Sequence, residues 1–170
     1  MAQPHDSDIK PLLLEKDNDM CFGCHVDVHE LVKKADVHPA LEGGCTSCHN
    51  PHGGPNGKHL IAEFSPDPYV SYTDTAYPLC FSCHKRDLVQ YPETSFATGF
   101  RDGERNLHFA HVNNKTKGRS CRMCHNVHGG NQPMLIADSA PFGKWSPPLK
   151  FVNTETGGSL APANVQAEVS

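Results

Sequence analysis

The sequence is short of the apolar side chains that a chain of its length normally uses for a core. Of 170 residues, 37% are hydrophobic and 8% aromatic, and there is a single tryptophan. Globular domains usually contain about 45–50% apolar residues when glycine is counted. This scarcity argues against a doubly wound sheet, a closed barrel or a long helical bundle. It also predicts that something other than side chains fills much of the interior.

Long apolar runs and excess positive charge are also missing. The longest apolar runs, at 11–14 and 60–62, are far below the about 18–20 residues of a membrane span. The chain has 15 Lys and Arg against 19 Asp and Glu, a formal net charge of −4, which disfavours nucleic-acid binding. Its first residues have neither the basic nor the apolar region of a signal peptide. We therefore expect either a cytoplasmic protein or one whose signal peptide is not included.

Glycine and proline are frequent, with 14 of each. Both residues interrupt regular structure, so short elements and long loops are expected. We predict a mainly irregular fold with short α-helices, one at 27–34 and another at 105–111. Little sheet is expected beyond a short strand near 150–152.

Cysteine and histidine are abundant, and every cysteine belongs to one kind of motif. The 8 cysteines form Cys-x-x-Cys pairs, and one of the 12 histidines follows each pair directly. The motifs are Cys21/Cys24/His25, Cys45/Cys48/His49, Cys80/Cys83/His84 and Cys121/Cys124/His125. This pattern is typical of haem c attachment: the cysteines form thioethers to the porphyrin and the histidine is the proximal iron ligand. The sequence therefore predicts four covalent haems, which would form the core.

Other readings of the cysteines explain less of the pattern. Paired zinc knuckles would use all eight thiolates, but they do not require a histidine after every second cysteine. A disulfide framework would leave the histidines unexplained. A thioredoxin-like redox site uses one motif rather than four. Zinc is the more serious of these alternatives.

The chain contains an internal repeat. The pattern Cys-x-x-Cys-His-Asn-x-His-Gly-Gly occurs at 45–54 and again at 121–130, and Leu-Ile-Ala with an acidic residue follows both. The preceding motif of each half reads Cys-Phe-x-Cys-His, at 21–25 and 80–84. The repeat therefore predicts two tandem two-haem modules.

The boundaries of the modules follow from the repeat and from composition. We predict an N-terminal segment at 1–19, a first module at 20–64, a Pro-rich linker at 65–78, a second module at 79–140 and an extended tail at 141–170. The second module has a longer spacer between its motifs. We interpret the extra residues near 91–118, which are polar and rich in glycine, as a surface excursion.

Histidines outside the motifs are the candidates for the distal iron ligands. The repeat selects four of them: His38, His52, His111 and His128. His29 is the alternative to His38, and His108 is the alternative to His111. The other two, His5 and His59, are expected at the surface, where histidine is usually solvated or hydrogen-bonded.

Geometry limits which haem each distal histidine can bind. Axial ligands lie on opposite faces of the porphyrin, so a three-residue link cannot pass around the ring. His52 must therefore bind a haem other than that of His49, and the same holds for His128 and His125. The simplest arrangement gives His52 and His128 to the first haem of their modules. We favour the second haem of each module for the other two distal ligands.

With these motifs the chain resembles the doubled Cys-x-x-Cys-His family of multihaem cytochromes c, tetrahaem electron carriers of anaerobic respiration. The shared features are the Cys-Phe-x-Cys-His opening, Val-His before the second motif and Cys-His-Asn-x-His-Gly after it, over about 20–140. The resemblance implies a non-enzymatic carrier that moves electrons along bis-histidine haems. It also implies an exported, periplasmic or extracellular protein whose signal peptide is absent from this chain. Implied partners are other redox proteins, such as membrane quinol-oxidising or outer-membrane cytochromes.

Two alternative functions stay open. One is a haem-chain subunit that self-assembles into an extracellular conducting filament, with the tail at 141–170 as a docking strap. The other is a multihaem reductase with an open haem site, which the number of spare histidines disfavours.

Overall fold

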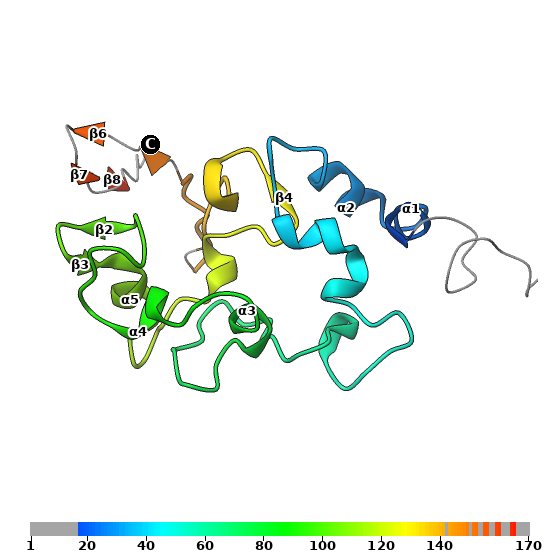
Figure 1. The fold of residues 1–170 in the computed structure, drawn as a ribbon, viewed down its shortest axis with the longest axis horizontal. Helices are drawn as coiled ribbons and strands as arrows, with labels where there is room; N and C mark the ends of the chain where they lie inside the picture. Colours follow the sequence, from blue (N-terminus) through cyan, green and yellow to red (C-terminus); the bar gives the residue numbers. More distant parts are fainter. Residues whose placement is uncertain are drawn as a thin grey trace, which may run out of the picture.

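A computed structural model of the chain describes residues 17–141 and 143–149, and the backbone of four two-residue strands between 151 and 165. The fold is elongated, with α1 (Asp17–Phe22) and α2 (Val26–Leu31) at one end and α5 (Leu107–Val112) towards the other (Figure 1). Most of the predicted segment at 1–19, with His5, and most of the tail at 141–170 lie outside the described side chains.

No helix in the described part of the chain is longer than six residues. The remaining α-helices are α3 (Pro78–Phe81) and α4 (Asp87–Gln90). The 3₁₀ turns are η1 (Pro39–Gly43), η2 (Cys45–Ser47), η3 (Gly57–His59), η4 (Cys121–Met123) and η5 (Pro133–Leu135). Helices this short are marginal alone, so contacts with neighbouring segments must hold them.

The strands are two residues long and form four separate antiparallel pairs. They are β1 (Asp36–Val37) with β4 (Gly129–Gly130), β2 (Arg101–Asp102) with β3 (Arg105–Asn106), β5 (Phe151–Val152) with β8 (Asn164–Val165), and β6 (Glu155–Thr156) with β7 (Ser159–Leu160). The β1–β4 pair joins the two predicted modules. Gly129 is required there, because a Cβ on it would lie 2.1 Å from the carbonyl oxygen of Leu31.

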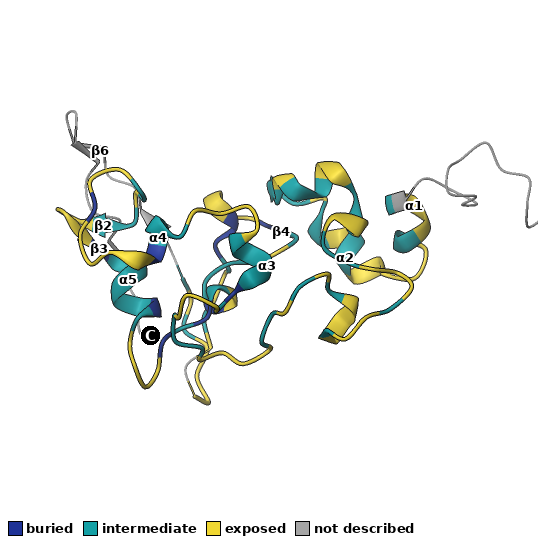
Figure 2. Ribbon diagram, turned by 60° about the horizontal axis from the view of Figure 1, so that its bottom comes forward, coloured by how far each residue is buried: buried dark blue, intermediate teal, exposed yellow. Residues whose placement is uncertain are grey.

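Buried residues are few and scattered in the described part of the chain, as Figure 2 shows. The buried apolar side chains among them are few as well. They are Tyr77, Val89, Val112, Met123, Leu135 and Ile136. Three of them, Tyr77, Val89 and Val112, form one cluster, which Phe81, Cys80 and Cys121 border. The polypeptide alone therefore has only a small core, and this core lies against two of the haem-attachment motifs.

The irregular architecture with short helices and little sheet is as predicted, but element boundaries differ. The helix predicted at 27–34 is α2, which ends at Leu31. The helix predicted at 105–111 begins later, because the Asn106 side chain accepts a hydrogen bond from the Phe109 amide (3.2 Å) and caps α5. The strand predicted at 150–152 appears as β5.

The interpretation of 91–118 as a surface excursion is wrong for 106–112, whereas 102–105 and 114–117 are exposed. The segment 106–112 consists of Asn106, which is 0% exposed, and α5, and it follows the β2–β3 turn. Asn106 Nδ2 donates to the carbonyls of Leu88 and Tyr91, both at 3.0 Å. These internal hydrogen bonds replace solvent for a polar segment, so composition alone does not reveal its burial.

The predicted linker at 65–78 packs along the end of this segment. The Tyr72 amide donates to the Val112 carbonyl (3.0 Å), and the Ser120 amide donates to the Pro68 carbonyl (2.9 Å). Gly118 permits this approach, since a Cβ on it would lie 2.5 Å from Ser71 Cα. Among the described residues, no helix has the length and apolar character needed to cross a bilayer.

Candidate haem-binding site

All four Cys-x-x-Cys-His motifs adopt the same turn. In each one the histidine amide donates to the carbonyl of the first cysteine, four residues earlier. These distances are 2.9 Å for His25–Cys21, 3.0 Å for His49–Cys45, 2.9 Å for His84–Cys80 and 2.9 Å for His125–Cys121. One helical turn thus closes around each pair of thiols, and all eight cysteines are free thiols. This is the local geometry that the spacing predicts.

A backbone carbonyl orients the proximal imidazole in the second motif of each half. Nδ1 of His49 lies 2.9 Å from the Lys58 carbonyl, and Nδ1 of His125 lies 2.9 Å from the Met134 carbonyl. A carbonyl can only accept, so Nδ1 carries the proton and Nε2 is left free for a metal. Lys58 and Met134 have positive φ angles of 56° and 57°. This backbone conformation points their carbonyls towards the two imidazoles.

A second backbone hydrogen bond is also repeated next to both imidazoles. The Asn50 amide donates to the His59 carbonyl, and the Asn126 amide donates to the Leu135 carbonyl, each at 2.7 Å. His59 and Leu135 also have positive φ angles, of 55° and 58°. The internal repeat of the sequence therefore corresponds to a repeated local structure, including a pair of left-handed residues that the sequence analysis missed. The signal that could have revealed these residues is their equal distance in sequence from the motif histidine: Lys58 follows His49, and Met134 follows His125, by nine residues.

Three proximal imidazoles each face a histidine from outside the motifs. The distances between ring centroids are 6.4 Å for His49–His128, 6.2 Å for His84–His38 and 6.1 Å for His125–His108. Two metal–nitrogen bonds of about 2 Å and about 1.2 Å from each nitrogen to its ring centre would separate the centres of two imidazoles on one metal ion by about 6.4 Å. The residues present therefore fit iron held between two imidazoles.

This pairing of histidines differs from the predicted one. We expected His128 at the haem of His84 and His38 at the haem of His49, whereas each faces the other imidazole in the structure. The cause is the β1–β4 pair, which continues as a hydrogen bond from the His38 amide to the His128 carbonyl (3.0 Å). Both histidines therefore lie where segments from the two predicted modules cross.

In α5 the imidazole that faces His125 belongs to His108, not to His111. Burial, followed by the nearby His125 and His111, lowers the pKa of His108 to about 4, and its Nδ1 lies 3.0 Å from Thr98 Oγ1. His111 instead stacks on Phe100 at 5.7 Å. The structure thus places His108, the alternative named for this position, beside His125.

Burial also disfavours the protonated form of three other histidines in these pairs. It is the leading cause that lowers the pKa of His38, His125 and His128, and a neighbouring histidine adds to it in each case. Iron binds the neutral imidazole, so a lowered pKa favours the ligating form.

His38 has an additional role as a helix cap. Its Nδ1 accepts a hydrogen bond from the Ala40 amide (3.2 Å) at the start of η1. An imidazole that binds iron through Nε2 keeps its proton on Nδ1 and cannot accept there. Metal binding through Nε2 would therefore release this cap.

The remaining candidates lie nearer the surface. His25 and His52 are exposed, and the His52 amide donates to Asn50 Oδ1 (3.1 Å). His29 stacks on Phe22 with 4.4 Å between ring centroids. His59 is exposed, in the position that the sequence predicts.

The motifs lie next to one another in chain order. The Cys45 amide, in the second motif, donates to Asn18 Oδ1 (2.9 Å) in the helix that carries Cys21. Burial raises the pKa of Cys48, and the nearby Cys83 and Cys80 add to this effect. Cys80 and Cys121 share a side-chain hydrogen bond, which together with burial raises the pKa of Cys121. Each attachment turn is therefore close to the next.

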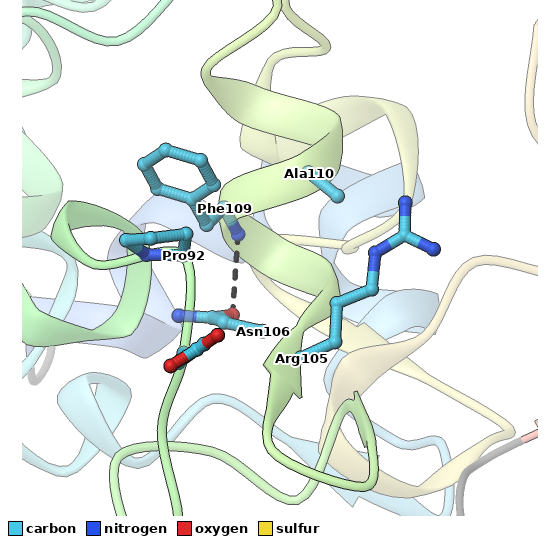
Figure 3. Close-up of a pocket in the computed structure, with 6 residues that line it drawn as sticks. Pro92, Arg105, Asn106, Phe109 and Ala110 are labelled. Atoms are coloured by element: carbon cyan, nitrogen blue, oxygen red, sulfur yellow. Dashed lines mark hydrogen bonds between the residues drawn. The ribbon is translucent and has the colours of Figure 1, made fainter.

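A pocket of about 450 Å³ opens on α5 and the β2–β3 hairpin (Figure 3). It is lined by Pro92, Glu93, Arg105, Asn106, Phe109 and Ala110. Figure 3 shows Asn106 beneath Phe109, joined by the cap hydrogen bond. No group of three or more metal-binding side chains converges within the described residues; the histidines lie in pairs instead.

Comparison with known families identifies one similarity. The family model described as doubled CXXCH motif matches residues 3–30 and 38–88, just under half of the chain. The matched ranges include the first three motifs, and the motif at Cys121 lies outside them. No curated protein and no solved structure matches the chain. The similarity supports a multihaem c-type cytochrome with covalent haem c, a class that generally carries electrons and is typically exported.

Proposed function

We propose that the protein is a tetrahaem c-type cytochrome that passes electrons between redox partners without catalysing a reaction of its own. Bound haem supplies one-electron chemistry. The chain supplies two thioether-forming cysteines and a proximal histidine for each haem. We assign His128, His38 and His108 as the distal ligands opposite His49, His84 and His125.

The observation that carries this proposal is the spacing of the three imidazole pairs, 6.1–6.4 Å between ring centroids. Each pair joins the histidine of a Cys-x-x-Cys-His turn to a histidine from outside the motifs, and this combination of partners supports the proposal. Histidine on both faces closes the coordination sphere, which suits electron transfer rather than substrate binding. It also gives lower potentials than methionine–histidine ligation.

For the haem of Cys21 and Cys24 we retain His52 as the proposed distal ligand. His29 is unsuitable because it lies only four residues after His25 and packs on Phe22. The exposure of both His25 and His52 makes this haem the natural point of exchange with a partner.

The compartment and partners follow from the cofactor and the charge. Haem c is attached outside the cytoplasmic membrane in the family that the chain resembles, so we propose an exported protein. The formal charge of −4, with haem propionates added, favours basic partners or direct contact at exposed haem edges. Membrane quinol-oxidising and outer-membrane cytochromes are the proposed donor and acceptor classes.

The test is the mass of the chain made together with a c-type maturation system. We expect the polypeptide plus four haem masses, resistant to acid-acetone extraction, and a six-coordinate low-spin spectrum that does not respond to CO. The double variant Cys121→Ala/Cys124→Ala should carry three haems. A colourless protein that contains zinc would contradict the proposal, and CO binding by the unaltered protein would favour a reductase.

A further inference from the structure

The two histidines of α5 have different hydrogen-bond partners at Nδ1. Nδ1 of His108 lies 3.0 Å from Thr98 Oγ1. Nδ1 of His111 lies 2.7 Å from the Leu107 carbonyl, one turn earlier in the same helix. The hydrogen bond of His111 is therefore internal to α5, whereas that of His108 joins the helix to another segment of the chain.

This other segment is itself fixed to the start of α5. The Leu107 amide donates to the Phe100 carbonyl (3.1 Å), and the Phe100 amide donates to Thr98 Oγ1 (3.0 Å). The Phe100 ring makes a T-shaped contact with His108, at 5.1 Å between centroids, and stacks on His111 at 5.7 Å. The segment thus gives His108 a polar partner and covers one face of His111 with a phenyl ring.

The Thr98 hydroxyl suits an imidazole that binds iron. Such an imidazole uses Nε2 for the metal and carries its proton on Nδ1, where a hydrogen-bond acceptor fixes the ring and makes it a stronger ligand. A hydroxyl oxygen has two lone pairs, so Thr98 Oγ1 can accept from Nδ1 of His108 and from the Phe100 amide together. Unlike the helix cap of His38, this contact can persist when iron is bound.

We propose that Thr98 is a positioning residue that selects His108 over His111 as the distal ligand of the haem at the fourth motif. The inference rests on the proposed function, because it requires haem at that motif. Loss of a hydrogen-bond partner of this kind typically costs about 10–100-fold in metal affinity. Without the hydroxyl, His108 should leave the iron more often, and His111 should compete for the vacated position.

Three variants separate the hydroxyl from the turn that it stabilises. Thr98→Val removes the hydroxyl and keeps the shape of the side chain, whereas Thr98→Ser keeps the hydroxyl. Thr94→Val is the matched control in the same loop, because Thr94 Oγ1 accepts from the amides of Phe96 (3.3 Å) and Ala97 (2.9 Å). Within the described residues, this hydroxyl bonds to those amides and to no histidine, so the control loses turn hydrogen bonds alone.

The first measurement is the rate of CO binding to the reduced, haem-loaded protein, because CO binds only while the distal ligand is off the iron. Each variant is made with and without His111→Ala, so that His111 cannot hide the loss of His108. In the His111→Ala background we expect Thr98→Val to speed CO binding at one haem about tenfold. Thr98→Ser should restore the slow rate, and Thr94→Val should leave it nearly unchanged. Intact mass is measured beforehand, so that fewer than four haems in the unaltered protein counts against the proposed function and not against Thr98.

Electron paramagnetic resonance of the oxidised proteins tests the choice between the two histidines. The signal of a low-spin haem depends on the orientation of its axial imidazoles, so Thr98→Val alone should show a second low-spin signal that His111→Ala removes. Absence of this signal, unchanged CO binding in Thr98→Val, an equal effect of Thr94→Val, or no recovery in Thr98→Ser would each overturn the proposal. If Thr98→Val does not take up four haems, Thr98→Ala, which also lacks the hydroxyl, decides in its place.

Discussion

At the scale of single residues, the distal position in α5 depends on where the helix begins. His108 and His111 are three residues apart on one side of α5, and either could reach an iron from sequence alone. Because Asn106 caps the helix, His108 lies in its first turn, 6.1 Å from His125. His111 is held differently, since its Nδ1 lies 2.7 Å from the Leu107 carbonyl and its ring stacks on Phe100.

We therefore predict that His108→Ala opens the haem bound by His125. One of the four haems should become high-spin and bind CO when reduced, because the iron loses its sixth ligand. Optical and resonance Raman spectra of the reduced protein with and without CO provide the measurement.

The control for this substitution is His59→Asn. His59 is exposed, and asparagine tolerates the positive φ of 55° at this position. This variant should remain fully low-spin. Retention of four low-spin haems in His108→Ala, together with CO binding in His111→Ala, would restore the original choice of His111.

The sequence predicts the local turn of each motif better than it predicts which histidines lie near one another. Cys-x-x-Cys-His is a local pattern, and its turn is closed by a hydrogen bond within five residues. The repeat could single out His38 and His128 as candidates, but not the imidazoles that they face. That choice depends on the contact between β1 and β4, residues about 90 positions apart, which no local pattern encodes.

At the scale of elements, two short left-handed segments place a carbonyl on a proximal imidazole. Each follows its motif histidine by nine residues: Lys58-His59 after His49 and Met134-Leu135 after His125. Side chains other than glycine rarely adopt this conformation, which costs roughly 1–2 kcal/mol per residue. Strain of this kind persists where the surroundings fix it, and here it coincides with orientation of a proposed metal ligand.

Met134 allows this idea to be tested without touching a ligand, since its side chain is 80% exposed. Met134→Ile should lower the thermal midpoint of the haem-loaded protein by about 2–4 °C, because a β-branched residue resists positive φ. Met134→Gly should keep the wild-type midpoint, since glycine adopts this φ freely. Thermal unfolding followed by circular dichroism provides the measurement.

The matched control is Met20→Ile, on the exposed side of α1 where φ is helical. It should change the midpoint by less than Met134→Ile does. Equal effects of the two substitutions would show that loss of methionine, rather than backbone strain, sets the stability. Composition predicted that elements would be short, but it could not show these segments, because lysine, histidine, methionine and leucine do not signal positive φ.

At the scale of the whole molecule, the imidazoles lie in one continuous sequence of neighbours. The His38–His84 pair lies between the other two: His38 bonds to the backbone of His128, and His84 is close enough to His125 to lower its pKa. The thiols of the motifs repeat this order, since Cys80 neighbours both Cys48 and Cys121. The proposed haem of Cys80 and Cys83 is therefore central, with a haem on either side.

A central haem should influence its neighbours electrostatically, and His38→Met tests this. Replacing one histidine by methionine raises the potential of that haem, so one redox step should separate upwards from the others. The central haem then accepts its electron first, and its added negative charge should lower the steps of the adjacent haems, as expected for interacting sites. Spectroelectrochemical titration resolves both effects. A single step that moves while the other three stay in place would contradict a contiguous haem chain. A change in the charge of one haem must shift the reduction potentials of haems close to it.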